Sequence, residues 1–207
     1  MRELITTTFL TLDGVMQAPG GPGEDDSNGF SHGGWSVGYW DADMEASMGE
    51  TMGKPFDLVL GRKTYDIFAS HWPHADDPAA ELLNNATKYV ASRTRSELEW
   101  QNSQLLGHDV PAAVRALKED DGPELQVHGS GDLIQTLLRH GLVDEIRVYI
   151  FPLVLGSGKR LFGDGAIPAG FEVAKAKVSG TGVIMATYRS GAEIKYGSFA
   201  LETPGKA

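Results

Sequence analysis

Asp57-Leu-Val-Leu-Gly-Arg-Lys-Thr-Tyr65 is the stretch of sequence that decides the fold. In it a short apolar strand stops at Gly61 and passes directly into a helix, and His128-Gly-Ser-Gly-Asp132 repeats that kind of junction further along the chain. Strands that alternate with helices in this way usually pair in parallel, with right-handed crossovers. The two junctions therefore predict an α/β fold.

Apolar and β-branched runs extend this pattern in both directions. We predict strands over 2–12, 57–61, 87–92, 125–128, 143–155, 171–178, 182–189 and 193–201. We predict helices over 41–52 and 109–118, capped by Asp41 and Asp109, and a third that opens at 129–132 and ends at Gly141. The last three strands follow one another through short turns that contain glycine, so they are expected to be antiparallel. The whole is a mixed, mostly parallel sheet.

Composition and charge narrow the function classes. The 207 residues suffice for one good core, so we expect a single domain over residues 1–207. The net charge of -10 disfavours nucleic acid and anionic lipid as partners. Cysteine is absent, which excludes disulfides, thiolate catalysis and Cys-ligated metals. There is no run that resembles a signal peptide and no stretch of about 20 apolar residues, so we expect a cytoplasmic protein.

The segment from Gln17 to Tyr39 is rich in Gly, Pro and Asp, and we interpret residues 17–40 as a flap-like insert. Its aromatic residues are Phe30, Trp35, Tyr39 and Trp40. Aromatic side chains within a glycine-rich loop indicate either a lid that packs over a ligand or anchors that hold the loop on the core. The sequence leaves both interpretations open.

The two junctions are candidate phosphate sites, because the start of a helix presents unpaired N–H groups and a positive dipole end. The first adds Arg62, Lys63 and the Thr64 hydroxyl, which suit a 2′-phosphate, whereas the second is almost bare backbone and suits a pyrophosphate. Ser92-Arg93-Thr94 follows the next strand and supplies a third basic, hydroxyl-bearing group. One glycine-rich turn is more often a packing turn, but three in this order favour a dinucleotide.

These residues also resemble a known family. The segments that carry the resemblance are 12–14, 60–65, 88–94, 129–131, 141–145 and 152–162, and the last reads Pro-Leu-Val-Leu-Gly-Ser-Gly-Lys-Arg-Leu-Phe. Together they resemble the reductase domain of the bifunctional riboflavin-pathway deaminase-reductases, the C-terminal half of those enzymes, and they are more distantly similar to dihydrofolate reductase. The resemblance spans about residues 4–188.

The resemblance implies a dihydrofolate-reductase-like three-layer fold with helices on both faces of the sheet, an NADPH cofactor, a small heterocyclic substrate and a homodimer. It assigns to the adenosine phosphate Gly61, Arg62 and Thr64, flanked by Ser92 and Arg93. It assigns to the pyrophosphate Gly129, Ser130, Gly131, Asp132 and Leu133. It puts Asp13 near the nicotinamide, and it puts Leu155 and Gly156 at the border of the pocket.

Two departures from the family bear on the function. The chain has no His/Cys zinc motif of a deaminase, and its insert at 17–40 is larger than the corresponding loop of the riboflavin enzymes. We therefore expect a reductase similar to 5-amino-6-(5-phosphoribosylamino)uracil reductase. The alternatives are a pterin or folate reductase, or a module on the same fold that binds a ligand without turnover. A flavodoxin relative that binds FMN is disfavoured by the antiparallel terminal strands.

Reduction of a heterocycle also needs a proton, and a carboxyl group with a raised pKa is a candidate donor. We name Asp13, at a strand end, and Glu45, on the helix that carries the active-site carboxylate in dihydrofolate reductase; the alternative for Glu45 is a solvated helix surface. His71 and His74 precede two aspartates, but without a Cys partner this loop predicts no metal site. Lys159-Arg160 fits either a substrate phosphate or ordinary surface charge.

Overall fold

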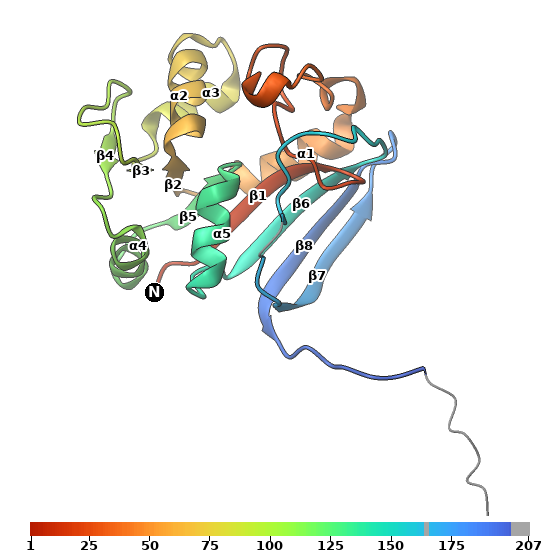
Figure 1. Ribbon diagram of the computed structural model, residues 1–207. Coiled ribbons are helices and arrows are strands. Elements are labelled where there is room, and N and C mark those ends of the chain that lie inside the picture. Colours follow the sequence, from red (N-terminus) through yellow and green to blue (C-terminus); the bar gives the residue numbers. More distant parts are fainter. Residues whose placement is uncertain (164–165, 200–207) are drawn as a thin grey trace, which may run out of the picture.

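A computed structural model of the protein describes residues 1–163 and 166–199. Its centre is one eight-stranded sheet with the order β4-β3-β2-β5-β1-β6-β8-β7 (Figure 1). The strands are β1 (Leu4–Thr11), β2 (Phe56–Gly61), β3 (Lys88–Ala91), β4 (Ser103–Leu105), β5 (Glu124–His128), β6 (Glu145–Phe151), β7 (Gly170–Val178) and β8 (Ile184–Ala192). The strands from β4 to β6 in this order are parallel, and β8 and β7 are antiparallel to their neighbours. This arrangement confirms the mixed, mostly parallel sheet.

Helices cover both faces of the sheet, so the fold has three layers. They are α1 (Ala42–Met52), α2 (Arg62–His71), α3 (Pro78–Asn85), α4 (Val110–Glu119) and α5 (Gly131–Arg139), with short 3-10 turns η1 (Ser27–Gly29), η2 (Val37–Tyr39) and η3 (Trp72–His74). One face carries α1, whose buried Met44 packs with the insert, together with α2 and α3, which form a separate core cluster, and the other face carries α4 and α5. None of the helices in the two described ranges has the length and apolar character of a membrane span.

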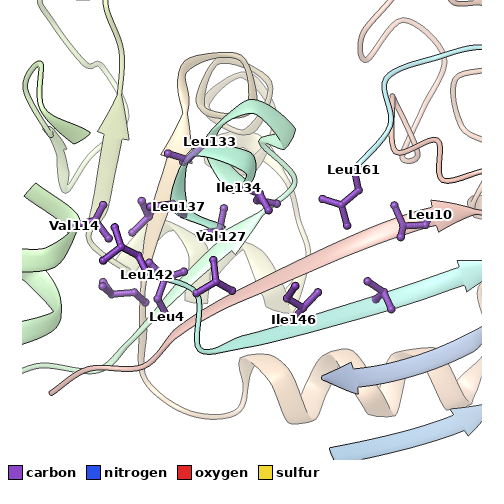
Figure 2. Packing of buried hydrophobic residues seen from close by; sticks show 14 of the residues in the cluster. Leu4, Leu10, Val114, Val127, Leu133, Ile134, Leu137, Leu142, Ile146 and Leu161 are labelled. Carbon is purple, nitrogen blue, oxygen red and sulfur yellow. The ribbon is translucent and has the colours of Figure 1, made fainter. Parts of the chain in front are cut away.

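The apolar face of α5 fixes the second junction to the sheet. Ile134 and Leu137 are completely buried, and Leu133 is nearly so (Figure 2). They share one core cluster with Val127 of β5 and Leu10 of β1. Because full burial of each such side chain contributes about 1.5–3 kcal/mol, the start of α5 is held firmly above the strand ends. The helix ends before Gly141, whose φ of 62° confirms the predicted left-handed residue.

The prediction of a strand over 143–155 was too long at both ends, since β6 covers only Glu145–Phe151. Pro152 has no N–H to continue the ladder, and the N–H of Leu153 donates to the carbonyl of Phe151 at 2.8 Å. The chain leaves the sheet there and forms the loop that carries Leu155 and Gly156. This shortening creates one wall of the candidate site.

The prediction of a last strand over 193–201 was wrong for residues 193–199, which have no regular structure, and residues 200–201 lie outside the described part. Ala192 already pairs with Gly170, the first residue of β7, and β6 ends its pairing with β8 at Arg189. A continuation of β8 therefore has no neighbouring strand, although its alternating sequence is typical of one.

The sequence interpretation missed α3 and β4. Asp77 caps α3, because its carboxylate accepts from the N–H of Ala79 at 2.7 Å, and Pro78 occupies the first turn. The signal was present in Asp77-Pro78, but the sequence analysis considered Asp77 only as a possible metal neighbour of His71 and His74. β4 has only three residues and depends on its pairing with β3, so no local pattern marks it.

Candidate functional site

The side chain of Ser130 joins the two junctions. β2 and β5 are parallel neighbours, so Gly61 and Gly129 emerge at the same edge of the sheet. The N–H of Gly61 donates to Ser130 Oγ at 2.9 Å, and that hydroxyl donates to Thr64 Oγ1 at 2.7 Å. The two turns therefore converge on one place, as the dinucleotide hypothesis requires.

Two helix starts at this edge have no side-chain cap. The carboxylates of Asp41, Asp77 and Asp109 cap α1, α3 and α4. α2 begins after Gly61 and α5 after Ser130, and among the described residues neither has a side-chain capping hydrogen bond. The first N–H groups of α5, from Gly131 to Leu133, have no backbone acceptor in the described ranges. Unpaired N–H groups at a helix start are ready to bind an anion.

The turn before α5 is shaped for close approach to the backbone. Gly129 and Ser130 both have left-handed conformations, with φ values of 62° and 63°. A Cβ on Gly131 would lie 3.0 Å from the sulfur of Met16, so a side chain at this position would require Met16 to move. The side chain of Asp132 is exposed, whereas Leu133 is a core residue and offers only its backbone to a ligand.

The turn after β3, which contains Ser92 and Arg93, brings Arg95 to α2 instead of the predicted Arg93. Ser92 Oγ accepts from the N–H groups of Thr94 and Arg95, at 3.2 and 2.9 Å, so it shapes its own turn. Arg93 is exposed, and Arg95 instead lies at 2.8 Å from Asp66 on α2.

Asp66 also binds Arg62 at 2.8 Å, so one carboxylate gathers two guanidinium groups beside the start of α2. Both pairs are partly exposed and weak, so both guanidinium groups remain available to a phosphate. Sequence analysis missed Arg95, because only the turn stabilised by Ser92 reveals which residue faces α2.

Asp13 is a hydrogen-bond acceptor that holds the loop after β6. Its carboxylate accepts from the Thr11 hydroxyl at 2.5 Å and from the N–H groups of Gly156 at 2.9 Å and Leu155 at 3.3 Å. The hydrogen bond from Thr11 contributes most to lowering the pKa of Asp13 to about 2, against a raising effect of burial. The raised pKa that we expected for Asp13 is therefore contradicted, and the contact with Leu155 and Gly156 connects three predicted site residues.

Glu45 lies on the exposed side of α1. The next residue back, Met44, is completely buried against the sheet, and the Ser47 hydroxyl lies 2.9 Å from the hydroxyl of Tyr149. The carboxylate of Glu45 forms no hydrogen bond or ion pair within the described ranges. The structure does not bring it into contact with Asp13.

The insert is anchored on the core. Phe30 and Trp35 are buried, and the ring of Trp35 meets Phe151 edge-on with 5.2 Å between centroids. The structure thus favours anchors for these two aromatic residues, while Trp40 remains 46% exposed. Gly158 of the loop after β6 approaches the insert so closely that a Cβ there would lie 2.9 Å from the Phe30 ring.

Gln17 is the polar centre of the insert and was not singled out in the sequence. Its Nε2 donates to the carbonyls of Asp25 and Ser27, its Oε1 accepts from the N–H of Lys159, and its own carbonyl accepts from Trp35 Nε1. A buried residue with four such bonds has few alternative positions. Gln17 therefore ties the insert to the loop after β6.

Lysine side chains gather where the insert meets this loop. The ammonium of Lys159 forms an ion pair with Asp25. The nearby Lys159 also lowers the pKa of Lys63 on α2, since two like charges oppose each other there. The prediction left Lys159 open between a phosphate ligand and surface charge, and the structure puts it at the candidate site with a carboxylate partner. Arg160 is exposed and donates from Nε to the carbonyl of Asp13 at 2.8 Å.

His128 adds a neutral polar group on the α1 side of the sheet. Its Nε2 lies 2.8 Å from Gln126 Oε1, and because Gln126 Nε2 donates to Thr51, Nε2 of the imidazole carries the proton. Burial, with a smaller effect of Arg147, lowers the pKa of His128 to about 4. Thr7 lies beside it in register, and its buried hydroxyl has no hydrogen-bond partner in the part of the chain that the structure describes.

His71 and His74 do not form a metal centre with their neighbours. His71 ends α2 and stacks edge-on against Trp72 at 4.9 Å, and η3 replaces the predicted loop at His74. In the described ranges no three His, Asp or Glu side chains are grouped as metal ligands.

Comparison with known proteins gives the chain its context. Residues 2–185 match the family described as the RibD C-terminal domain. The uncharacterised protein YyaP of Bacillus subtilis (strain 168) is 30% identical over 90% of this chain and 94% of its own length.

Two solved structures share the fold. The Thermotoga maritima diaminohydroxyphosphoribosylaminopyrimidine deaminase/5-amino-6-(5-phosphoribosylamino)uracil reductase aligns over 92% of this chain and 57% of its own, with a TM-score of 0.60 and 15% identity. Enterococcus faecalis dihydrofolate reductase, complexed with NADP(H) and RAB-propyl, aligns over 92% of this chain and 97% of its own, with a TM-score of 0.56 and 14% identity. These matches confirm the dihydrofolate-reductase-like fold.

Proposed function

Because the chain belongs to the RibD C-terminal domain family, we propose that it is an NADPH-dependent reductase of a small heterocyclic substrate similar to 5-amino-6-(5-phosphoribosylamino)uracil. The Thermotoga relative carries the name of a reductase of that compound, and the Enterococcus relative was solved with NADP(H). This chain corresponds to little more than half of the Thermotoga protein.

The observation that carries the proposal is the pair of uncapped helix starts joined by Ser130. The unpaired N–H groups at the start of α5 fit the pyrophosphate of a dinucleotide, because the turn before them brings no bulky side chain. Arg62 and Arg95 fit a 2′-phosphate, which NADPH has and NADH lacks. These residues therefore fit the cofactor that the fold family implies.

The cofactor would supply the hydride, and the protein positions the reactants and excludes water. With its pKa near 2, Asp13 is anionic at neutral pH, so its proposed role is to hold Leu155 and Gly156 at the pocket border. Glu45 remains our candidate proton donor. The neutral imidazole of His128 and the free hydroxyl of Thr7 suit the amide and amine edges of a heterocycle.

Fluorescence titration with NADPH and NADH tests the cofactor. We expect NADPH to bind more tightly, and Arg62→Ala and Arg95→Ala each to weaken NADPH by about tenfold, since a hydrogen bond between charged groups contributes roughly 1.5–3 kcal/mol. NADH binding should stay unchanged in both variants. Arg115→Ala, an exposed arginine on α4, is the matched control. Equal affinity of the protein for both dinucleotides would remove the 2′-phosphate argument.

Turnover separates the reductase from its alternatives. NADPH absorbance is followed with an aminopyrimidine carrying a phosphoribosyl chain, and in parallel with dihydropterin and dihydrofolate. Turnover of the aminopyrimidine supports the proposal, while turnover of the pterins alone favours a pterin or folate reductase. Tight NADPH binding without turnover of any of them favours the non-catalytic binding module. Glu45→Gln should lower the single-turnover rate without changing NADPH affinity.

A further inference from the structure

Asp66 on α2 contacts two arginines from different parts of the chain. Its Oδ2 accepts from Nη1 of Arg62, one turn earlier on the helix, at 2.8 Å. Its Oδ1 lies 2.8 Å from Nε of Arg95, which follows β3. Because Arg62 and Arg95 would carry the preference for a 2′-phosphate, a change at Asp66 acts on both guanidinium groups at once.

The two contacts of Asp66 differ in kind. The contact with Arg62 is a hydrogen bond. The contact with Arg95 is an ion pair only, because the buried Oδ1 of Asp66 accepts no hydrogen bond from the residues in the described ranges. The guanidinium group of Arg95 is thus held by charge, while its N–H groups remain free to donate to another acceptor.

Other contacts restrict where Arg95 can lie. The hydroxyl of Ser92 accepts from the backbone N–H of Arg95 at 2.9 Å, so the turn sets the start of the side chain. The guanidinium carbon lies 6.0 Å from the ring centroid of Tyr65, a range in which a cation is attracted to an aromatic ring. Tyr65 is buried, and its hydroxyl accepts from the N–H of Trp100 at 2.9 Å, so this ring is held in place. Arg95 therefore lies between a fixed ring and the carboxylate of Asp66.

We infer that Asp66 is a positioning residue, which holds the guanidinium groups of Arg62 and Arg95 together so that both bind one phosphate group of the ligand. The inference rests on the proposed function, in which that group is the 2′-phosphate of NADPH. Two guanidinium groups repel each other, and without a shared partner their long side chains occupy several rotamers, which the ligand would have to restrict on binding. The carboxylate brings the two groups together before the ligand arrives.

The phosphate has no need to displace the carboxylate. Each guanidinium group has five N–H donors. Asp66 uses one of these on Arg62, and it meets Arg95 at Nε, so the two terminal nitrogens of Arg95 remain for a bidentate contact. The side chains of Arg62 and Arg95 are 40% and 38% exposed, so a ligand can reach them. Two positive charges against one negative charge still attract a phosphate.

Removal of the negative charge tests the inference. Fluorescence titration with NADPH and NADH gives the ratio of the two dissociation constants for wild type and for Asp66→Asn, which keeps the shape of the side chain. We expect Asp66→Asn to lower the preference for NADPH about fivefold, since the two ion pairs are partly exposed and each is weak. The affinity for NADH, which has no 2′-phosphate, should change much less.

Two further variants make the measurement specific. Asp66→Glu restores the charge and should recover part of the preference for NADPH. The matched control is Asp121→Asn, which removes the charge of an exposed carboxylate after α4 and should leave the ratio unchanged. Asp66→Asn should also have a smaller effect on the ratio when it is combined with Arg95→Ala, because only one arginine then remains to be positioned.

The outcomes separate the inference from the proposed function. Equal affinity of the wild-type protein for NADPH and NADH would overturn both. A wild-type preference for NADPH that Asp66→Asn leaves unchanged would overturn the inference alone, as would an equal loss of affinity for both dinucleotides, which indicates a role in folding only. A gain in NADPH affinity would show that Asp66 competes with the phosphate, and the inference would be wrong.

Discussion

Replacement of Ser130 by alanine is the most direct test of how the site is built. The change removes the acceptor for the N–H of Gly61 and the donor to Thr64. Each hydrogen bond contributes about 1 kcal/mol, so Ser130→Ala should lower the free energy of unfolding by about 2 kcal/mol. Ser130→Gly loses the same bonds but relieves the left-handed conformation at φ 63°, which costs a residue with a Cβ roughly 1–2 kcal/mol. The glycine variant should therefore be more stable than the alanine variant by about 1 kcal/mol.

Urea unfolding of a double-mutant cycle measures the coupling directly. Thr64→Val removes one partner of the hydroxyl pair, so Ser130→Ala and Thr64→Val together should be about 1 kcal/mol less destabilising than the sum of the single changes. Ser70→Ala, an exposed hydroxyl near the end of α2, is a control that should add independently. Strict additivity of Ser130→Ala and Thr64→Val would refute the view that this contact joins the two junctions.

Three further predictions concern ionisable side chains that are buried or hydrogen-bonded. Asp13→Asn should destabilise the protein at pH 7, and because the pKa of Asp13 is lowered from 3.8 to about 2, the difference from wild type should shrink as the pH falls through that range in denaturant titrations. The pKa of His128 is lowered from 6.5 to about 4, so wild-type stability should fall between pH 6.5 and pH 4, where the unfolded chain takes up a proton and the folded chain does not. His128→Gln should flatten this pH dependence of the stability. An unchanged slope would contradict the burial of a neutral imidazole. Lys88 is buried over the ring of Trp100, and its ammonium donates to two backbone carbonyls. Lys88→Met should therefore lower the free energy of unfolding by about 2 kcal/mol in thermal unfolding, although methionine is the more hydrophobic residue. A gain in stability would show that those carbonyls need no donor.

The sequence predicted the elements whose signals are local. The junctions at Gly61 and Gly129, the caps Asp41 and Asp109, and the left-handed Gly141 all depend on residues within one turn of the chain, and the structure confirms them. The end of β8 depends on where β7 begins, and β4 depends on β3, so neither was predictable from its own residues.

In the candidate site too, local features were predictable from the sequence and long-range contacts were not. The glycine turns were identifiable because backbone conformation restricts residue type there. Three other features arise from contacts between segments far apart in the sequence. They are the bridge formed by Ser130, the position of Arg95 rather than Arg93 beside Arg62, and the hydrogen bonds of Gln17. The lowered pKa of Asp13 arises in the same way, since it needs the amides of Leu155 and Gly156. Spacing along the chain carries no information about such contacts.

The central position of β1 has a consequence for biosynthesis. This strand is made before the other seven strands of the sheet, yet its two neighbours in the sheet are β5 and β6, whose register partners lie at residues 125–128 and 145–151. At roughly 5–20 residues per second, the ribosome completes those partners on the order of 10 s after β1 emerges. During that interval the strand, with its run of threonines and apolar residues, is exposed and unpaired, and it is the segment of the nascent chain that a chaperone would have most reason to shield.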